Sequence, residues 1–358
     1  MQLERNNNFD LLRLFAATSV MIWHGAEHLG MFNDVYYLLA CLYHFPGVPI
    51  FFTISGFLIT HSLERNNFDF KTYFKNRSIR IFPALWLCTI LTAFLLFGFG
   101  KVTSLKDLSF WILAQFTFLQ FYAPESFKSW GVGHPNGSLW SIAVELQFYL
   151  ILPIILLIAH RIRKKIVVNL FLVALFFTSI VFRYIVDSEN MLHNYPILVK
   201  LSGNFVLYYL HFFLTGILLY KNYKFIQKLI TGKVVYWFIG YIFYLLIFKV
   251  WFGFYESPYS INIFGIMANT LLSLLSLSFA FSYQNLSGKL LNHNDISYGI
   301  YIYHMPIVNL MLSLNMKDSI IYLLGMMCFT ILLAIISWKM LERKIMLLFK
   351  NNIRQQHH

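Results

Sequence analysis

The chain has 358 residues, of which 58% are hydrophobic and only 12% are charged. Because a soluble globular domain carries about 25% charged residues, this composition excludes an ordinary soluble enzyme and indicates an integral membrane protein. The formal net charge of +13, from 28 basic and 15 acidic residues, would indicate nucleic-acid binding only if the basic residues formed one patch.

Ten apolar stretches are long enough to cross a bilayer, which requires about 20 residues, and they predict an all-α, polytopic membrane helix bundle. The predicted spans lie near 9–29, 44–63, 80–99, 138–160, 166–186, 204–220, 234–252, 262–282, 297–314 and 319–341. An eleventh apolar stretch, 105–121, is shorter. We expect one membrane domain over residues 1–350, followed by a cytoplasmic tail at 351–358 that resembles a tag remnant.

Basic residues gather in three loops, 64–80, 161–165 and 221–233, and cytoplasmic loops retain Lys and Arg. If all three loops are cytoplasmic, an even number of crossings separates spans 80–99 and 138–160. We therefore expect 105–121 to be a re-entrant or interfacial helix on the outer side, and both termini to be cytoplasmic. The cytoplasmic segments then carry a net charge of +15, the outer segments −2 and the spans zero. The basic excess reflects topology, and no nucleic-acid partner is expected.

The first predicted span holds the densest set of ionisable residues, which are costly inside a bilayer and usually functional. Arg13 and His24 are eleven residues apart, which places them on one stripe of a helix, about 16 Å apart. Asp10 can neutralise Arg13 across one turn. His24 is a candidate general base, and the alternative is a core histidine bonded to a neighbouring span. His28 is expected to be a solvated residue at the outer mouth.

The segment 135–153 combines a turn, Ser138 as an expected N-cap, and a span that carries Glu145. Glu145 and His24 are predicted at similar depths, about 10 Å and 8 Å below the outer ends of their spans. Glu145 is therefore a candidate partner that orients His24 or stabilises its protonated form. The alternative is a glutamate paired with a structural arginine such as Arg183.

The segment 76–86 carries Arg77 and Arg80 at the cytoplasmic mouth of a span. At a spacing of three residues, two guanidinium groups can converge on one phosphate. Pro83 is expected in the first turns of that span, where proline is tolerated. The alternative is simple anchoring by positive charge on the cytoplasmic side.

Two weaker patterns lie in other spans. Ser55 and Gly56 fall in the middle of a span, where a small residue permits close backbone approach. Tyr298, Tyr301 and His304 share one helix face, so His304 is either a second polar gate or a packing residue. The three cysteines show no ligand or redox spacing, and we expect neither a disulfide nor a metal site.

Five segments resemble, in order, the motifs of the acyltransferase-3 family, membrane enzymes that acylate bacterial surface sugars and related acceptors. The segments are FDLLRLFAATSVMIWH, FFTISGFLIT, NRSIRIFPALW, GSLWSIAVELQFYLILP and SYGIYIYH. The likeness covers roughly residues 5–345. In the family, the approach to the second span is richer in glycine and contains an aspartate. Here that stretch reads HFPGVPIFF, so no residue fills the role of the aspartate. Without the appended SGNH-type hydrolase domain of longer members, a stand-alone acyltransferase is expected.

The resemblance implies transfer of an acyl group, usually acetyl, from cytoplasmic acyl-CoA to a hydroxyl of a surface glycan such as lipopolysaccharide, capsule or exopolysaccharide, in the bacterial inner membrane. Arg77 and Arg80, with Arg13 as a third candidate, would hold the CoA phosphates, and Arg13 is also a candidate catalytic residue beside His24 and Glu145. His24 would deprotonate the acceptor or carry the acyl group, and Glu145 would orient it or balance its charge. The candidates for the acceptor mouth are Ser138, Trp140, Tyr149, Ser55 and His304.

The main alternative is a transporter or flippase for a glycan or a lipid-linked precursor, in which the intramembrane Arg, His and Glu residues line a path. A second alternative is a family member that uses succinyl-CoA or a non-sugar acceptor. The expected partners are the lipid bilayer, acyl-CoA and a glycan acceptor, and the sequence pattern specifies no oligomeric state.

Overall fold

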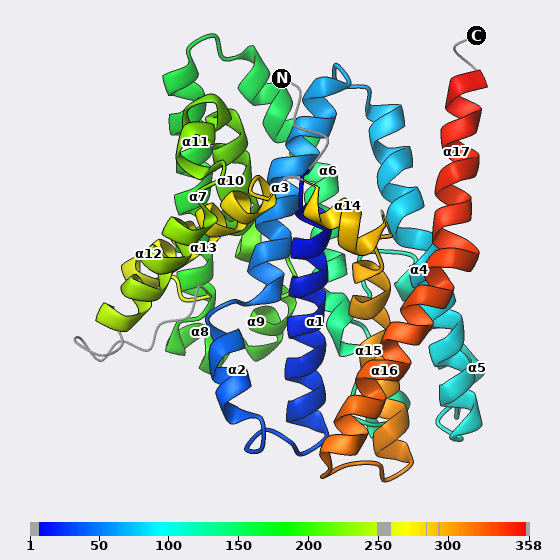
Figure 1. The fold of residues 1–358 in the computed structure, drawn as a ribbon. Helices are drawn as coiled ribbons and strands as arrows, with labels where there is room; N and C mark the ends of the chain where they lie inside the picture. The colour runs from blue at the N-terminus through cyan, green and yellow to red at the C-terminus, as the bar shows by residue number, and fades with distance from the viewer. Residues whose placement is uncertain (1–6, 249–258, 284, 293, 356–358) are drawn as a thin grey trace. The chain divides into compact units, whose positions relative to one another are not determined.

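The computed structural model describes residues 7–248, 259–283, 285–292 and 294–355 (Figure 1). All regular structure in these ranges is helical, which confirms the predicted all-α membrane fold. Two predictions lie outside the described residues: the end of the span at 234–252, which contains Lys249, and the last residues of the tail, with His357 and His358.

Seven helical segments of the described chain are long and apolar enough to cross a membrane, and a bent pair makes an eighth if it counts as one span. The seven are Tyr36–Arg65, Phe70–Gly98, Gly137–Arg161, Lys165–Val186, Pro196–Lys221, Ile263–Ala280 and Ile320–Phe349. The bent pair joins Tyr223–Ile230 to Val234–Leu246 at 87°. The chain is therefore a multi-pass membrane protein, and the count of ten spans stays a prediction.

Two further predicted spans form helices that are not among the seven. Helix α1 runs from Phe9–His28 and carries charged residues near both ends, which lowers its hydropathy. Helix α15 runs from Ser297–Ser313 and has 17 residues, a rise of about 25 Å. Both helices hold candidate site residues, so some of their polar side chains belong to the candidate site.

The eleventh apolar stretch forms a short helix, α5, over Leu105–Gln115. The hydroxyl of Ser104 caps it by accepting a hydrogen bond from the backbone N–H of Asp107, at 3.3 Å. Eleven residues rise about 16 Å, roughly half the hydrocarbon thickness. A helix of this length is too short to cross the bilayer. This agrees with the even number of crossings expected between the spans at 80–99 and 138–160.

The helices form two compact units, each assembled from separate stretches of the chain. The first unit contains Met1–Ala16, Cys41–Phe70 and Val144–His293. The second contains Ala17–Ala40, Lys71–Ala143 and Asn294–His358. The prediction of one domain over residues 1–350 stays a prediction.

In the first unit, α10 (Val206–Lys221) packs against both α3 (Gly47–Arg65) and α7 (Lys165–Val186). Two glycines permit the close approach of α3 and α10. A Cβ on Gly56 would collide with the carbonyl of Phe213, and a Cβ on Gly216 would collide with the carbonyl of Thr53. The predicted role of a small residue at position 56 is confirmed. The sequence analysis did not single out Gly216.

Six further helices belong to the first unit. They are α8 (Glu189–Asn194), α9 (Pro196–Ser202), α11 (Tyr223–Ile230), α12 (Val234–Leu246), α13 (Ile263–Ala280) and α14 (Leu286–Leu291). Two of them, α8 and α9, contribute no buried residue to its core. The first residue of α1, Phe9, packs edge-on against Phe281, with the ring centres 5.5 Å apart.

In the second unit, α15 runs beside α16 (Ile320–Ser337) (Figure 1). A turn of π-helix, Trp338–Glu342, connects α16 to α17 (Arg343–Gln355). Two short 3-10 turns, η1 (Glu125–Ser129) and η2 (Gly137–Leu139), lie before α6 (Trp140–Arg161). The helix α2 (Tyr36–Tyr43) has residues in both units, as do α1, α4 and α6.

Helix α4 (Phe70–Gly98) begins ten residues before the predicted span. The expected position of Pro83 in its first turns is therefore wrong, because Pro83 lies well inside the helix. Residues 70–82 contain no glycine or proline, so nothing in them stops the helix from extending beyond the apolar span. The break before it lies at Asn67 and Phe68, which have positive φ angles of 49° and 60°.

Candidate functional site

Two histidines from different helices of the second unit are in direct contact. Nδ1 of His24, near the end of α1, lies 2.9 Å from Nε2 of His304 in α15. The two rings are stacked, with their centres 5.2 Å apart and 22° between their planes. His304 is fully buried, whereas His24 is partly exposed. The structure thus gives the predicted base a partner, His304, that the sequence pattern suggested as a gate, a packing residue or part of the acceptor mouth, but not as a partner of His24.

The hydrogen bonds assign the protons of this pair. Nδ1 of His304 lies 3.2 Å from the carbonyl oxygen of Ile300, and a carbonyl only accepts, so this nitrogen carries the hydrogen. In a neutral imidazole the other nitrogen is then an acceptor. Nε2 of His304 therefore accepts the Nδ1–H of His24, and Nε2 of His24 keeps its lone pair. A histidine oriented through one nitrogen and basic at the other is arranged as a general base.

Aromatic rings enclose the histidine pair. The ring of His28 stacks on His24 at 5.9 Å, and the ring of Tyr301 meets His304 edge-on at the same distance. The Tyr301 hydroxyl lies 2.6 Å from the Ser141 hydroxyl. Tyr301 and His304, predicted from their spacing to share one helix face, therefore both contact other residues of the site.

Two asparagines bind the loop before α6 to α15. The Asn136 side chain donates to the carbonyl of Ile302 at 2.8 Å. The Asn309 side chain donates to the carbonyls of His134 and Pro135, at 2.8 Å and 3.1 Å. The sequence analysis used Asn136 only as part of a turn and did not mention Asn309. A buried amide inside an apolar span was the signal available for it.

Ser138 does not cap α6. It lies inside the 3-10 turn Gly137–Leu139, and α6 begins at Trp140. Its hydroxyl is fully buried and donates to the side-chain oxygen of Asn136, at 2.8 Å. The expected N-cap is therefore wrong, because the chain makes an extra tight turn before the helix. Trp140 is partly exposed.

Glu145 accepts two hydroxyl hydrogen bonds in the first unit. Ser55 and Tyr149 donate to the same carboxylate oxygen, at 2.7 Å and 2.5 Å. Hydrogen bonds to a carboxylate are stronger than those between neutral groups, and they offset part of the cost of placing an acid in a membrane. The structure thus brings together three of the predicted site residues.

Arg183 does not neutralise Glu145. Its Nε lies 3.3 Å from a carboxylate oxygen of Asp187, one turn later in the chain, so the alternative that paired Arg183 with Glu145 is wrong. The prediction that Glu145 partners His24 joins residues of different units and stays a prediction.

Two of the predicted basic residues, Arg13 and Arg80, have carboxylate partners. Nη1 of Arg13 lies 2.8 Å from Asp10, which confirms the expected pairing across one turn. Nη2 of Arg80 lies 2.5 Å from a carboxylate oxygen of Asp295, whose side chain is only 9% exposed. The sequence analysis did not single out Asp295. Arg77 is partly exposed and lies one turn before Arg80 in α4.

The sequence matches the family model of an acyltransferase domain over residues 6–339. The chain belongs to the acyltransferase-3 family. It is therefore an acyltransferase, and family membership decides against the transporter that the intramembrane charges left open. Within the described residues, no three or more His, Cys, Asp or Glu side chains form a group that could hold a metal ion.

Named relatives support the family assignment. The acyltransferase is 31% identical to nodulation protein 10 of Rhizobium leguminosarum bv. viciae, over 95% of this chain and 93% of that protein. It is 24% identical to the O-acetyltransferase OatA of Staphylococcus aureus, over 94% of this chain but only 56% of that protein. It is 31% identical to the putative peptidoglycan O-acetyltransferase YrhL of Bacillus subtilis, over 44% of this chain and 24% of that protein. No solved structure matches the chain.

Proposed function

We propose that this acyltransferase moves an acetyl group from acetyl-CoA to a hydroxyl of a surface glycan. The observation that carries the proposal is the histidine pair, in which His304 holds Nδ1 of His24 and leaves Nε2 of His24 basic. The names of two relatives, which are O-acetyltransferases, support acetyl as the group and oxygen as its acceptor.

In the proposed reaction, Nε2 of His24 takes the proton of the acceptor hydroxyl as the oxygen attacks the thioester carbonyl. The new C–O bond forms, the C–S bond breaks, and the proton returns from His24 to the departing thiolate. A positioned base contributes about 10²-fold to 10⁴-fold to such a step. His304 is a positioning residue, since it fixes the ring of His24 through the nitrogen that does not react.

We assign donor binding to the basic mouth of α4. Arg77 would contact the CoA phosphates, and Arg80, three residues later, would add a second guanidinium charge at the same mouth. Arg13 is a third candidate. In this proposal the mouth of α4 and both termini face the cytoplasm, where acyl-CoA is made, and the enzyme resides in the bacterial inner membrane.

Glu145 keeps the role that the sequence pattern gave it in the proposed reaction. Its carboxylate, held by Ser55 and Tyr149, would balance the positive charge that His24 gains during transfer. Trp140, which is partly exposed, remains the candidate for contact with a sugar ring of the acceptor, because aromatic faces pack well against apolar sugar faces.

The test replaces His24 by alanine in the host cell and measures ester-linked acetyl groups on surface glycans by mass spectrometry before and after mild base. H24A should abolish the base-labile acetyl groups while the protein still inserts into the membrane. H193A is the control, because His193 is an exposed histidine in α8 whose ring lies 3.4 Å from the side-chain oxygen of the neighbouring Asn194. Normal acetylation in well-expressed H24A cells would overturn the proposal.

A further inference from the structure

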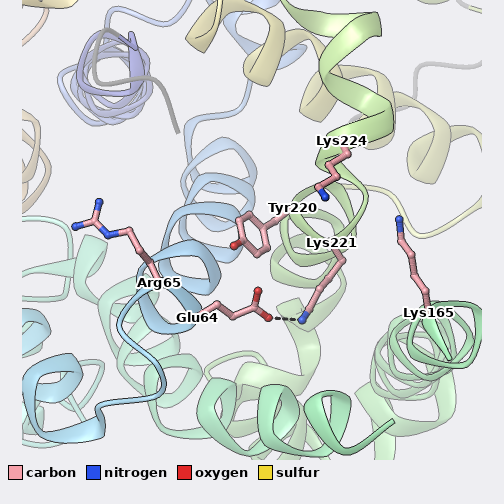
Figure 2. Close-up of a pocket in the computed structure, with 6 residues that line it drawn as sticks. All are labelled: Glu64, Arg65, Lys165, Tyr220, Lys221 and Lys224. Atoms are coloured by element: carbon pink, nitrogen blue, oxygen red, sulfur yellow. Dashed lines mark hydrogen bonds and ion pairs between the residues drawn. The ribbon is translucent and has the colours of Figure 1, made fainter. Parts of the chain in front are cut away.

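A basic cavity lies in the first unit, where the ends of three helices meet. It has a volume of about 290 Å³, and Figure 2 shows the side chains around it. The lining residues are Glu64 and Arg65 at the end of α3, Lys165 at the start of α7, Tyr220 and Lys221 at the end of α10, and Lys224 in α11. None of them has a role in the proposed transfer reaction.

The cavity has an uncompensated positive charge. Four of its six lining residues are basic and one is acidic, which leaves a formal net charge of +3. Lys221 forms an ion pair with Glu64 (Figure 2). Lys165 and Lys224 are exposed and make no ion pair with a carboxylate in the described part of the chain.

The basic lining residues reach the cavity from three separate stretches of sequence, which contain Arg65, Lys165, and Lys221 with Lys224. Each stretch belongs to a different loop that the charge pattern placed in the cytoplasm, and simple anchoring requires only that these loops share a side of the membrane. Anchoring does not require their ammonium groups to line one concavity, where like charges repel. An anion bound between them removes that repulsion.

Other features of the cavity suit a phosphate group. Lys165 is the first residue of α7, and no side chain caps that helix end, so its free N–H groups and the positive end of its dipole add to the lysine charges. Lys ammonium groups bind phosphate as point charges. The Tyr220 hydroxyl points toward Glu64 (Figure 2), and the volume lies at the small end of the range for ligand sites.

We propose that this cavity binds the phosphate group of an anionic ligand. Basic pockets between membrane helices on the cytoplasmic side bind phospholipid headgroups, and the position at three helix ends favours this source. A phosphate of a soluble nucleotide donor presents the same chemistry. The inference does not depend on acyl transfer, because binding is measured without a reaction.

The test uses the purified full-length protein and two probes. One arm measures the affinity for phosphatidylglycerol in phosphatidylcholine nanodiscs by native mass spectrometry, and the other measures the affinity for acetyl-CoA by calorimetry. The variant is K165Q/K224Q, since both side chains are exposed and their replacement leaves the helix packing intact. Each lysine near a charged surface contributes about 1 kcal/mol, so the affinity for the bound probe should fall about 30-fold.

The matched control is K228Q/K289Q. It removes two exposed lysines of the same unit that do not line the cavity, and both belong to loops predicted to be cytoplasmic. K165R/K224R should bind like the native protein, because it keeps the charge. A loss confined to phosphatidylglycerol identifies a lipid headgroup, and a loss confined to acetyl-CoA identifies the donor. Affinities for both probes that are unchanged in K165Q/K224Q, or that fall equally in K228Q/K289Q, would overturn the proposal.

Discussion

Nδ1 of His24 lies 2.9 Å from Nε2 of His304, although the two residues are 280 positions apart in the sequence. The contact gives α15 a direct part in the candidate site. It also explains how His24 can act as a base while Glu145 is held by two hydroxyl groups of the first unit. The sequence pattern assigned the orientation of His24 to Glu145, whereas in the structure His304 can orient His24.

The first prediction concerns His304. H304A should lower kcat about 100-fold with little change in the KM of either substrate, because the variant leaves His24 present but unoriented. H304Q should recover part of the loss, since the glutamine side-chain oxygen can accept the Nδ1–H of His24 and the side chain fills most of the space. Steady-state kinetics of the purified variants check both outcomes. Equal loss in H304A and H304Q, together with an equal fall in thermal stability, would mean that His304 only packs the core.

The second prediction concerns the hydroxyl groups on Glu145. Y149F keeps the ring but removes one donor, and it should lower kcat about tenfold, the effect of losing one hydrogen bond to a charged group. Y208F is the matched control, because the Tyr208 hydroxyl also donates to a carboxylate of the first unit, that of Asp187, at 2.6 Å. The prediction fails if the two variants have the same activity.

The third prediction separates donor binding from anchoring at the mouth of α4. R77A should raise the apparent KM for acetyl-CoA about tenfold, which corresponds to one lost charge-assisted hydrogen bond. D295A should lower the melting temperature by several degrees, because it removes the ion pair that holds a partly buried arginine, at a cost of about 2 kcal/mol or more. Donor titrations and thermal melts in detergent check both. An unchanged donor KM in R77A would return Arg77 to an anchoring role.

The fourth prediction tests the packing of α3 against α10. G56A should destabilise the protein by about 1–3 kcal/mol, since the new methyl group meets the rigid carbonyl of Phe213. G240A is the control, because a Cβ at Gly240 in α12 has no neighbour within 4 Å. That change should be neutral or stabilise the helix by up to about 1 kcal/mol. Thermal melts of both variants decide, and a G56A protein as stable as G240A would show that the two helices can separate without cost.

Several features of this acyltransferase follow from the sequence alone because they are local. The pairing of Arg13 with Asp10 depends only on the geometry of one helical turn. The length of the apolar stretch and the parity of the basic loops were enough to predict that α5 does not cross the membrane. The motifs also identified the family, because each is a short, contiguous set of residues.

The contacts that build the candidate site were decided by tertiary structure. Many membrane spans of this protein are apolar on all sides, so their hydrophobic periodicity does not show which helix face contacts which neighbouring helix. Hence the sequence placed His24 and His304 on their helices but did not pair them, and it missed Asp295 as the partner of Arg80. In the same way, the positive-inside rule put Lys165 and Lys224 on one side of the membrane, and only the packing of α3, α7, α10 and α11 brought them to one cavity. Local geometry fixes neighbours within a helix, whereas neighbours between helices depend on how the side chains of distant segments fit together.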